Sequence, residues 1–219
     1  MAKPVVGVIG ESGTGKSSMF ETLPSDRTIL INAELKPLPI KNFRQFKNVM
    51  TDTYKKITTV IKQLGTDDGA KYDYAVLDSF TSLTEIVNKY ASTAFNGYEV
   101  WAMYNQMIVD VIWDLKKLPQ QVFIIALPEQ KAMEFGETKS YARVKGKELK
   151  YGYLEKELAV VLFTNPVHDD ETGEMLDVHM HYKANKFNTA KSPRGMFDGV
   201  LKNDALDIAN KVEAYYGSD

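Results

Sequence analysis

The sequence predicts an α/β protein with a mainly parallel central sheet, flanking helices and an antiparallel hairpin extension. Short apolar runs, typical of buried strands, alternate with segments of helical period through most of the chain. Two later apolar runs flank the turn DDETGE, residues 169–174, which is the pattern of a β-hairpin. Strands that alternate with helices favour a parallel sheet, whereas a hairpin adds antiparallel strands.

The composition is that of a single globular domain over residues 1–219. Of these residues, 44% are hydrophobic and 26% are charged, and no linker or repeat divides the chain. The absence of cysteine excludes disulfides, thiol nucleophiles and cysteine-based zinc sites. Because the formal net charge is -2, any attraction to nucleic acid has to come from a local basic region. No signal peptide or apolar run of membrane-spanning length is visible, so we expect a cytoplasmic protein.

The first predicted strand, residues 5–9, leads into a loop and then a helix that starts near residue 16. The loop fits the phosphate-binding pattern G-x-x-x-x-G-K-[ST], with Gly10, Gly15, Lys16 and Ser17 at the fixed positions. Glycines let the backbone fold around phosphates, the lysine reaches the β- and γ-phosphates, and the hydroxyl binds Mg²⁺. The alternative is a glycine- and serine-rich turn without a ligand. The predicted nucleotide-binding residues are Gly10, Glu11, Ser12, Gly13, Thr14, Gly15, Lys16, Ser17 and Ser18.

The next two predicted strands, residues 28–34 and 72–78, end in the carboxylates Glu34 and Asp78. A proline-containing loop and an amphipathic helix over residues 53–64 lie between them. Ligands bind at the carboxyl ends of parallel strands, so we expect both side chains at the edge that holds the phosphate-binding loop. Asp78 would lie beside this loop and, with its serine, position Mg²⁺ or a metal-bound water. The alternative is that Asp78 caps the following helix.

Two helices, residues 83–94 and 98–118, precede a strand over residues 121–130 whose composition predicts full burial. The helical spacing of Trp101 and Tyr104 predicts that both aromatic side chains belong to the core.

The following segment, residues 131–153, is polar, contains glycine and lacks a clear period. Between residues 131 and 150 it carries six basic and three acidic side chains, with aromatic residues interleaved or adjacent. Cations that meet phosphates and rings that stack on bases are typical of single-strand nucleic-acid binding. The alternative is a solvated loop whose aromatics pack back on the domain. The candidate DNA-binding residues are Lys131, Lys139, Tyr141, Arg143, Lys145 and Lys147.

The predicted hairpin is followed by a basic loop over residues 185–197 and a helix over residues 204–216. His179 and His181 alternate on the second strand of the hairpin. We interpret both histidines as structural or solvent-facing rather than as metal ligands.

The order of these motifs resembles a known family. A phosphate-binding loop, a strand that ends in Ala-Glu, a helix and a strand that ends in Leu-Asp-Ser resemble the core of RecA-like P-loop ATPases. The later half, with VKGKELKYGYLEKELAVVLF before the hairpin and a basic loop after it, resembles more narrowly the small phage nucleotide-binding proteins of the AAA_24 type, some of which are single-strand annealing ATPases. The resemblance implies that Lys16 is catalytic, that Glu34 is the base that orients the attacking water, and that Asp78 is the carboxylate associated with Mg²⁺.

The resemblance also implies a sensor and a cation that acts between subunits. Gln130, just past the FIIAL run, matches the polar γ-phosphate sensor that couples to a DNA-binding loop, and Glu129 is a rival for this role. The candidates for the cation that acts in trans on a neighbouring nucleotide are Lys186, Lys191 and Arg194.

The implied cofactors are ATP and Mg²⁺. The implied partners are single-stranded DNA, further copies of the chain with nucleotide near the subunit interface, and a single-strand binding protein. A phage-encoded protein of this kind would act in the cytoplasm of its bacterial host.

These features lead us to expect a Mg²⁺-dependent ATPase of RecA-like type that acts on single-stranded DNA in recombination, annealing or replication. A small nucleotide kinase is one alternative, but such enzymes clamp phosphates with several arginines in a lid, whereas the four arginines of this chain are widely scattered. Another alternative is a nucleotide-binding interaction module that hydrolyses ATP slowly or not at all.

Overall fold

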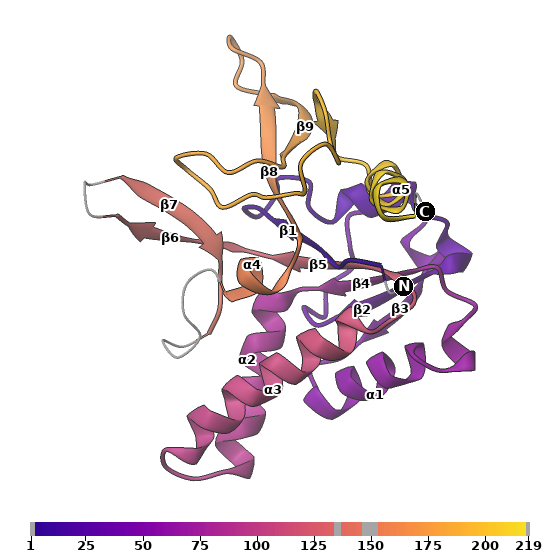
Figure 1. Ribbon diagram of the computed structural model, residues 1–219, viewed down its shortest axis with the longest axis vertical. Coiled ribbons are helices and arrows are strands. Elements are labelled where there is room, and N and C mark those ends of the chain that lie inside the picture. The colour runs from indigo at the N-terminus through magenta and orange to yellow at the C-terminus, as the bar shows by residue number, and fades with distance from the viewer. Residues whose placement is uncertain (1–2, 134–136, 146–152, 218–219) are drawn as a thin grey trace.

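The computed structural model describes residues 3–133, 137–145 and 153–217, and it confirms the predicted α/β fold (Figure 1). Within these residues, eight strands form one sheet in the order β10-β9-β8-β1-β5-β4-β2-β3. The strands of this sheet are β1 (Val6–Ile9), β2 (Thr28–Asn32), β3 (Lys47–Met50), β4 (Tyr74–Asp78), β5 (Gln121–Ala126), β8 (Val160–His168), β9 (Met175–His181) and β10 (Leu201–Lys202). The neighbours from β8 to β3 are parallel, and β9 is antiparallel to both β8 and β10.

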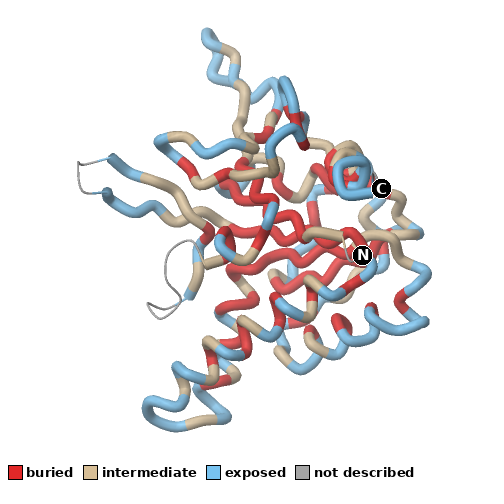
Figure 2. Tube along the Cα trace, viewed as in Figure 1, coloured by how far each residue is buried: buried red, intermediate tan, exposed pale blue. Residues whose placement is uncertain are grey.

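Helices cover both faces of the sheet. The helices are α1 (Tyr54–Leu64), α2 (Phe80–Ala94), α3 (Glu99–Lys116), α4 (Tyr153–Glu157) and α5 (Ala205–Tyr216). One core cluster joins α1, α2 and α3 to the sheet, and a second cluster joins α5 and the short 3-10 helix η1 (Ser18–Thr22) to the opposite face. Figure 2 shows the resulting buried centre, with the exposed residues at the periphery.

The central strands are buried on both faces because their side chains alternate between these two clusters. In β5, Val122 and Ile124 belong to the cluster with α1 to α3, whereas Phe123 and Ile125 belong to the cluster with α5. All six residues of β5 are buried. Continuous apolar runs of this kind are expected for parallel strands that are covered by helices on both sides.

A short helix follows the phosphate-binding loop, as predicted, but it is a 3-10 helix. Only the 3-10 helix Ser18–Thr22 follows the loop, and Leu23 is already extended. The physical reason is Pro24, because the residue before a proline is disfavoured in the helical region.

Several strands differ from the prediction in their boundaries, and one strand was not predicted. The buried strand ends at Ala126, and the chain continues into β6 (Pro128–Ala132), which pairs with β7 (Thr138–Ala142) as a separate antiparallel ribbon. The edge strand β3 was missed because its sequence, Lys-Asn-Val-Met, has no long apolar run and is only partly buried.

The prediction that Trp101 belongs to the core is wrong, whereas Tyr104 is fully buried. Trp101 is 39% exposed and makes an edge contact with Tyr104. The reason is tertiary, because the hairpin of α2 and α3 extends beyond the sheet and the first turn of α3 lies near its tip (Figure 1).

Candidate nucleotide-binding site

The predicted site lies at one edge of the sheet, where the carboxyl ends of β1, β2 and β4 meet. A pocket of about 460 Å³ opens there. Six of the nine predicted nucleotide-binding residues line it, namely Ser12, Gly13, Gly15, Lys16, Ser17 and Ser18. Gly10, Glu11 and Thr14 belong to the same loop but do not line the pocket. Glu34 and Asp78 also line it, so residues from three separate strand ends share one pocket.

The glycines of the loop have distinct physical roles. Gly13 and Gly15 have φ angles of 81° and 83°, a region that side chains rarely adopt. At Gly10, a Cβ atom would lie 1.9 Å from Oγ1 of Thr164, so only glycine fits there. Thr164 in β8 also shares a hydrogen bond of 2.7 Å with the hydroxyl of Thr14. The loop is therefore shaped by its own glycines and supported by β8.

Lys16 is buried and lines the pocket. Its ammonium group donates a hydrogen bond to the carbonyl oxygen of Glu11, which curls the side chain over the loop. Burial lowers the pKa of Lys16, and the negative charges of Asp78, Glu34 and Glu11 oppose this effect. A phosphate bound in the loop would supply the anion that a buried ammonium group requires.

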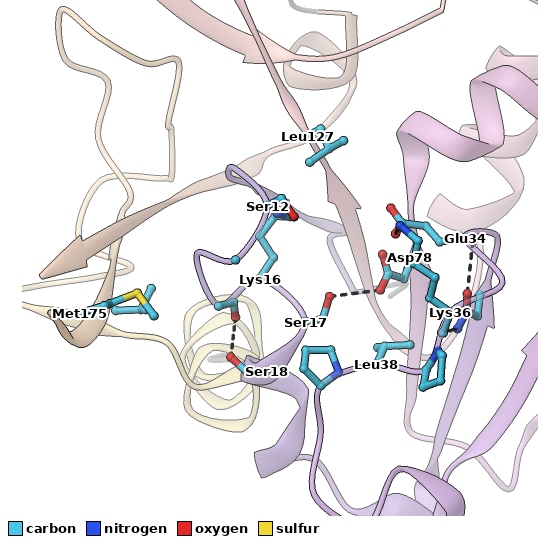
Figure 3. A pocket seen from close by; sticks show the side chains of 16 residues that line it. Ser12, Lys16, Ser17, Ser18, Glu34, Lys36, Leu38, Asp78, Leu127 and Met175 are labelled. Atoms are coloured by element: carbon cyan, nitrogen blue, oxygen red, sulfur yellow. Dashed lines mark hydrogen bonds and ion pairs between the residues drawn. The ribbon is translucent and has the colours of Figure 1, made fainter. Parts of the chain in front are cut away.

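Ser17 and Asp78 form the pair expected at a Mg²⁺ site. The hydroxyl of Ser17 donates a hydrogen bond of 3.2 Å to Oδ2 of Asp78, as Figure 3 shows. Asp78 is only 6% exposed, and its burial and the nearby charge of Glu34 raise its pKa to about 6. A cation beside the carboxylate would relieve both effects.

Asp78 reaches the loop although β4 is not the neighbour of β1. The expectation that Asp78 lies beside the phosphate-binding loop is confirmed, but β5 lies between the two strands. Asp78 is the last residue of β4, so its side chain emerges past the end of the sheet and reaches Ser17 across the width of β5.

Glu34 lies just past the end of β2, which stops at Asn32 rather than at Glu34. One carboxylate oxygen accepts a hydrogen bond of 3.0 Å from the hydroxyl of Ser79, and the other lies 3.5 Å from Nζ of Lys36. Leu35 has a φ of 58°, and this turn brings Lys36 back alongside Glu34. Ser79 and Lys36 thus hold the carboxylate in the pocket, although its side chain remains 28% exposed.

The described residues fit Mg²⁺ with a nucleotide rather than a metal held by protein alone. They contain no group of three or more His, Cys, Asp or Glu side chains that could hold a metal ion. Mg²⁺ commonly binds through one or two carboxylates together with substrate phosphates and water. Ser17 and Asp78 provide such a partial set of ligands beside a loop shaped for phosphates.

The sensor candidates do not reach this pocket. After β5 the chain places Leu127 at the pocket, and Gln130 and Glu129 then lie in β6 without lining it. Gln130 is exposed and paired with Ser140 of β7. The sequence prediction assumed that the buried strand continues to residue 130, whereas the departure of the ribbon at Pro128 carries these side chains away.

The three basic candidates for action in trans lie in the long loop between β9 and β10, and none of them lines the pocket. The backbone of Lys191 pairs with Val161 through two hydrogen bonds of 2.8 Å. The ammonium group of Lys186 lies 4.9 Å from the ring centroid of Phe187, and Arg194 is exposed.

The candidate DNA-binding residues follow the β6–β7 ribbon, which projects away from the sheet (Figure 1). Lys131 and Lys139 are directly opposite one another, and Tyr141 is opposite Glu129. Arg143 and Lys145 are exposed at the base of the ribbon, and Lys147 lies outside the described residues. The region where the sequence indicated no period therefore contains the end of β6 and the whole of β7.

Sequence reasoning missed several residues of the site. Ser79 follows Asp78 in the Leu-Asp-Ser motif, so its position next to Glu34 had a local signal. Met175 and Val178 of β9 line the pocket, and no local pattern marks them. Figure 3 shows Met175 on the side opposite Glu34 and Asp78. Thr164 is likewise found only through the pairing of β8 with β1.

The comparison with protein families identifies the chain. Residues 2–193 match the family described as AAA domain, AAA_24. No curated protein matches the chain. Among the described residues, none of the helices has the length and apolar character needed to cross a membrane. With a phosphate-binding loop at the edge of an α/β sheet and a match over most of its length, the chain belongs to this AAA domain family of P-loop nucleotide-binding ATPases.

Proposed function

We propose that this protein is a Mg²⁺-dependent ATPase that acts on single-stranded DNA in phage-type recombination, annealing or replication. The observation that carries the ATPase assignment is the hydrogen bond between Ser17 and Asp78 in a pocket that also contains Lys16 and Glu34. These four side chains are the set that phosphate binding, metal binding and water activation require.

In this proposal each side chain has one role. The loop N–H groups and Lys16 bind the phosphates, and Ser17 and Asp78 hold Mg²⁺. The metal ion, when bound, neutralises charge that develops on the phosphate oxygens. Glu34 orients a water molecule toward the γ-phosphate and accepts its proton, and its contacts with Ser79 and Lys36 keep the carboxylate directed into the pocket.

The β6–β7 ribbon supports the choice of single-stranded DNA as the partner. Lys131 and Lys139 are cross-strand neighbours, so they place two cationic side chains on one face of the ribbon. A phosphate backbone lying along this face would meet both cations, and Tyr141 on the same face offers a ring for base stacking.

An assembly of several copies is part of the proposal. Lys186, Lys191 and Arg194 do not line the pocket of their own chain, so the proposed role of one of them is to reach the nucleotide of the next subunit. Head-to-tail contacts of this type build rings or open helices. A single-strand binding protein is a further proposed partner.

Phosphate release from ATP, measured with and without single-stranded DNA and with and without Mg²⁺, tests the proposal. We expect hydrolysis that requires Mg²⁺ and is stimulated by DNA, and no hydrolysis by the Lys16→Ala variant. ADP formation that depends on added AMP or dNMP would instead indicate a nucleotide kinase. Nucleotide binding with neither reaction would indicate an interaction module.

A further inference from the structure

We infer that Asn203, between β10 and α5, is a positioning residue that orients the phosphate-binding loop for nucleotide binding. The inference rests on the proposed nucleotide-binding function. Asn203 lies outside residues 2–193, the region matched by the family, so this support is added by the C-terminal part of the chain.

The side chain of Asn203 contacts the loop at its last glycine, Gly15. Its Nδ2 donates a hydrogen bond of 2.9 Å to the carbonyl oxygen of Gly15 and lies 3.5 Å from Oγ of Ser18. The same carbonyl accepts hydrogen bonds from the Ser18 hydroxyl at 2.9 Å and from the Met19 amide at 3.3 Å. The Gly15 carbonyl is thus held from outside the loop as well as from within it.

The orientation of this carbonyl matters because of the geometry of the peptide bond. A trans peptide unit is planar, so the N–H of Lys16 points opposite to the C=O of Gly15. By holding the carbonyl on the side of α5, Asn203 directs the Lys16 amide the other way. Backbone amides of this loop are the groups that bind phosphates in the proposed function.

Packing around Gly15 leaves little freedom for this arrangement to change. A Cβ atom at Gly15 would lie 2.9 Å from Nδ2 of Asn203 and 3.1 Å from Cγ2 of Val178. The backbone amide of Asn203 also donates a hydrogen bond of 3.2 Å to the carbonyl oxygen of Val178. Asn203 and β9 therefore form one wall against the loop.

The packing of α5 against the loop segment fixes the position of Asn203. The cap of this helix is a separate, local contact, in which Asp204 accepts a hydrogen bond of 2.9 Å from the amide of Asp207. The amide of Leu206 donates a hydrogen bond of 3.1 Å to the hydroxyl of Thr22, at the end of the short helix that follows the loop. Buried side chains of α5, including Ile208, belong to the same core cluster as Phe20. The hydrogen bond to Thr22 and the packing of α5 with Phe20 thus hold the segment between β10 and α5 next to the phosphate-binding loop.

The other half of the Asn203 amide favours a positioning role over a purely structural one. Its Oδ1 is buried and has no hydrogen-bond partner among the described residues. A buried acceptor without a partner costs stability. We therefore attribute the presence of asparagine at this position to the hydrogen bond that its Nδ2 donates to the Gly15 carbonyl.

The test compares Asn203→Ala with Asp204→Ala, a neighbouring change that removes the cap of α5 but does not contact the loop. Dissociation constants of Mg·ADP and Mg·ATP are measured by calorimetry on the full chain, together with the melting temperature without nucleotide. We expect Asn203→Ala to weaken both nucleotides about tenfold, which is about 1.4 kcal/mol. Asp204→Ala should lower the melting temperature at least as much and leave both affinities within about twofold of the wild type.

A second variant, Asn203→Asp, has the shape of asparagine but turns a carboxylate oxygen toward the Gly15 carbonyl. It should weaken nucleotide binding more than Asn203→Ala, and it serves as the test if the alanine variant does not fold. Wild-type affinity in these Asn203 variants, or an equal loss of affinity in Asp204→Ala, would overturn the inference alone. A wild-type chain that binds neither nucleotide would overturn the proposed function and the inference with it.

Discussion

Lys16 is buried, whereas most lysine side chains in proteins are exposed to solvent. Its ammonium group is buried, with Asp78, Glu34 and Glu11 as the nearby negative charges. Lys16→Ala removes the point charge that faces the phosphates, so nucleotide affinity or turnover should fall at least about tenfold. Lys41→Ala is the matched control, because the side chain of Lys41 is 86% exposed. Equal ATP binding and turnover in both variants would contradict the assignment of the loop.

A substitution of Glu34 tests nucleotide binding and ATP hydrolysis separately. Glu34→Gln retains the size of the side chain and a hydrogen-bonding group for Ser79, but it cannot accept a proton. We expect ATP binding to persist and hydrolysis to fall by about 100-fold or more. Single-turnover phosphate release and nucleotide titration measure the two quantities separately. Hydrolysis at the wild-type rate would mean that the base is a residue other than Glu34.

Asp78 makes the nucleotide-free protein sensitive to pH. Its pKa is about 6 in the folded chain, above the ordinary value of 3.8, so the folded state binds more protons between these values. Stability from this group is therefore lost as the pH rises from about 4 to about 6. Asp78→Asn removes this penalty and should stabilise the nucleotide-free protein at pH 8 by about 2–3 kcal/mol. Urea unfolding at pH 4 and pH 8 measures the difference, and a variant less stable than the wild type at pH 8 would contradict it.

The same carboxylate sets the pH range of Mg²⁺ binding. The metal binds the ionised form of Asp78, and protonation below pH 6 competes with it. The Mg²⁺-dependent part of nucleotide affinity should fall about tenfold per pH unit below that value. Titrations of ADP with and without Mg²⁺ at several pH values measure this dependence. Asp78→Asn should abolish the metal-dependent part at every pH, and an unchanged pH profile in this variant would exclude Asp78 as the group responsible.

At the scale of elements, the β6–β7 ribbon is the part of the protein that can be tested for DNA binding without disturbing the pocket. The double variant Lys131→Ala, Lys139→Ala removes the opposed pair of charges from one face of the ribbon. We expect weaker binding of single-stranded DNA, and a salt dependence whose log–log slope is smaller by about 1.4. Fluorescence anisotropy at several salt concentrations measures both.

The control for the ribbon is a pair of lysines on another surface. Lys62 and Lys117 line a separate groove that involves α1 and α3. Their double alanine variant should bind DNA as the wild type does, and both double variants should retain ATP affinity in the absence of DNA. If neither double variant lost affinity for DNA, the assignment of DNA binding to the ribbon would be contradicted.

At the scale of the whole molecule, the prediction concerns assembly of several copies of the chain. The loop between β9 and β10 carries Lys186, Lys191 and Arg194, and these side chains do not line the pocket of their own chain. A cation supplied from a neighbouring subunit can contribute about 1000-fold or more to the rate of phosphoryl transfer. We therefore expect the triple alanine variant and Lys16→Ala to be inactive separately.

Mixing these two inactive variants should restore part of the activity, because some interfaces then combine an intact phosphate-binding loop with an intact basic loop. ATP turnover of the mixture is the measurement, and native mass spectrometry shows whether mixed assemblies form. No recovery in mixed assemblies, or full activity of the triple variant alone, would exclude action in trans.

Local patterns in the sequence were sufficient for much of the fold and for the centre of the site. The phosphate-binding loop is contiguous, and the burial of β1, β2, β4 and β5 follows from their apolar composition. The helix α1 was predicted almost to the residue, because Ile57, Val60, Ile61 and Leu64 repeat with helical spacing. Glu34 and Asp78 could be placed at the pocket because parallel strands bring their carboxyl ends to one edge.

Only the tertiary structure decided which strands are neighbours and which distant residues complete the site. It inserts β5 between β1 and β4, and it diverts the chain after Ala126 into a ribbon that carries Gln130 away from the pocket. It also brings Asn203 to Gly15, 188 positions away in the sequence. Composition and periodicity report the burial and geometry of neighbouring residues, whereas such contacts depend on how whole elements pack. The chemistry of the phosphate-binding loop is therefore readable in the sequence, and the support that holds this loop in shape is not.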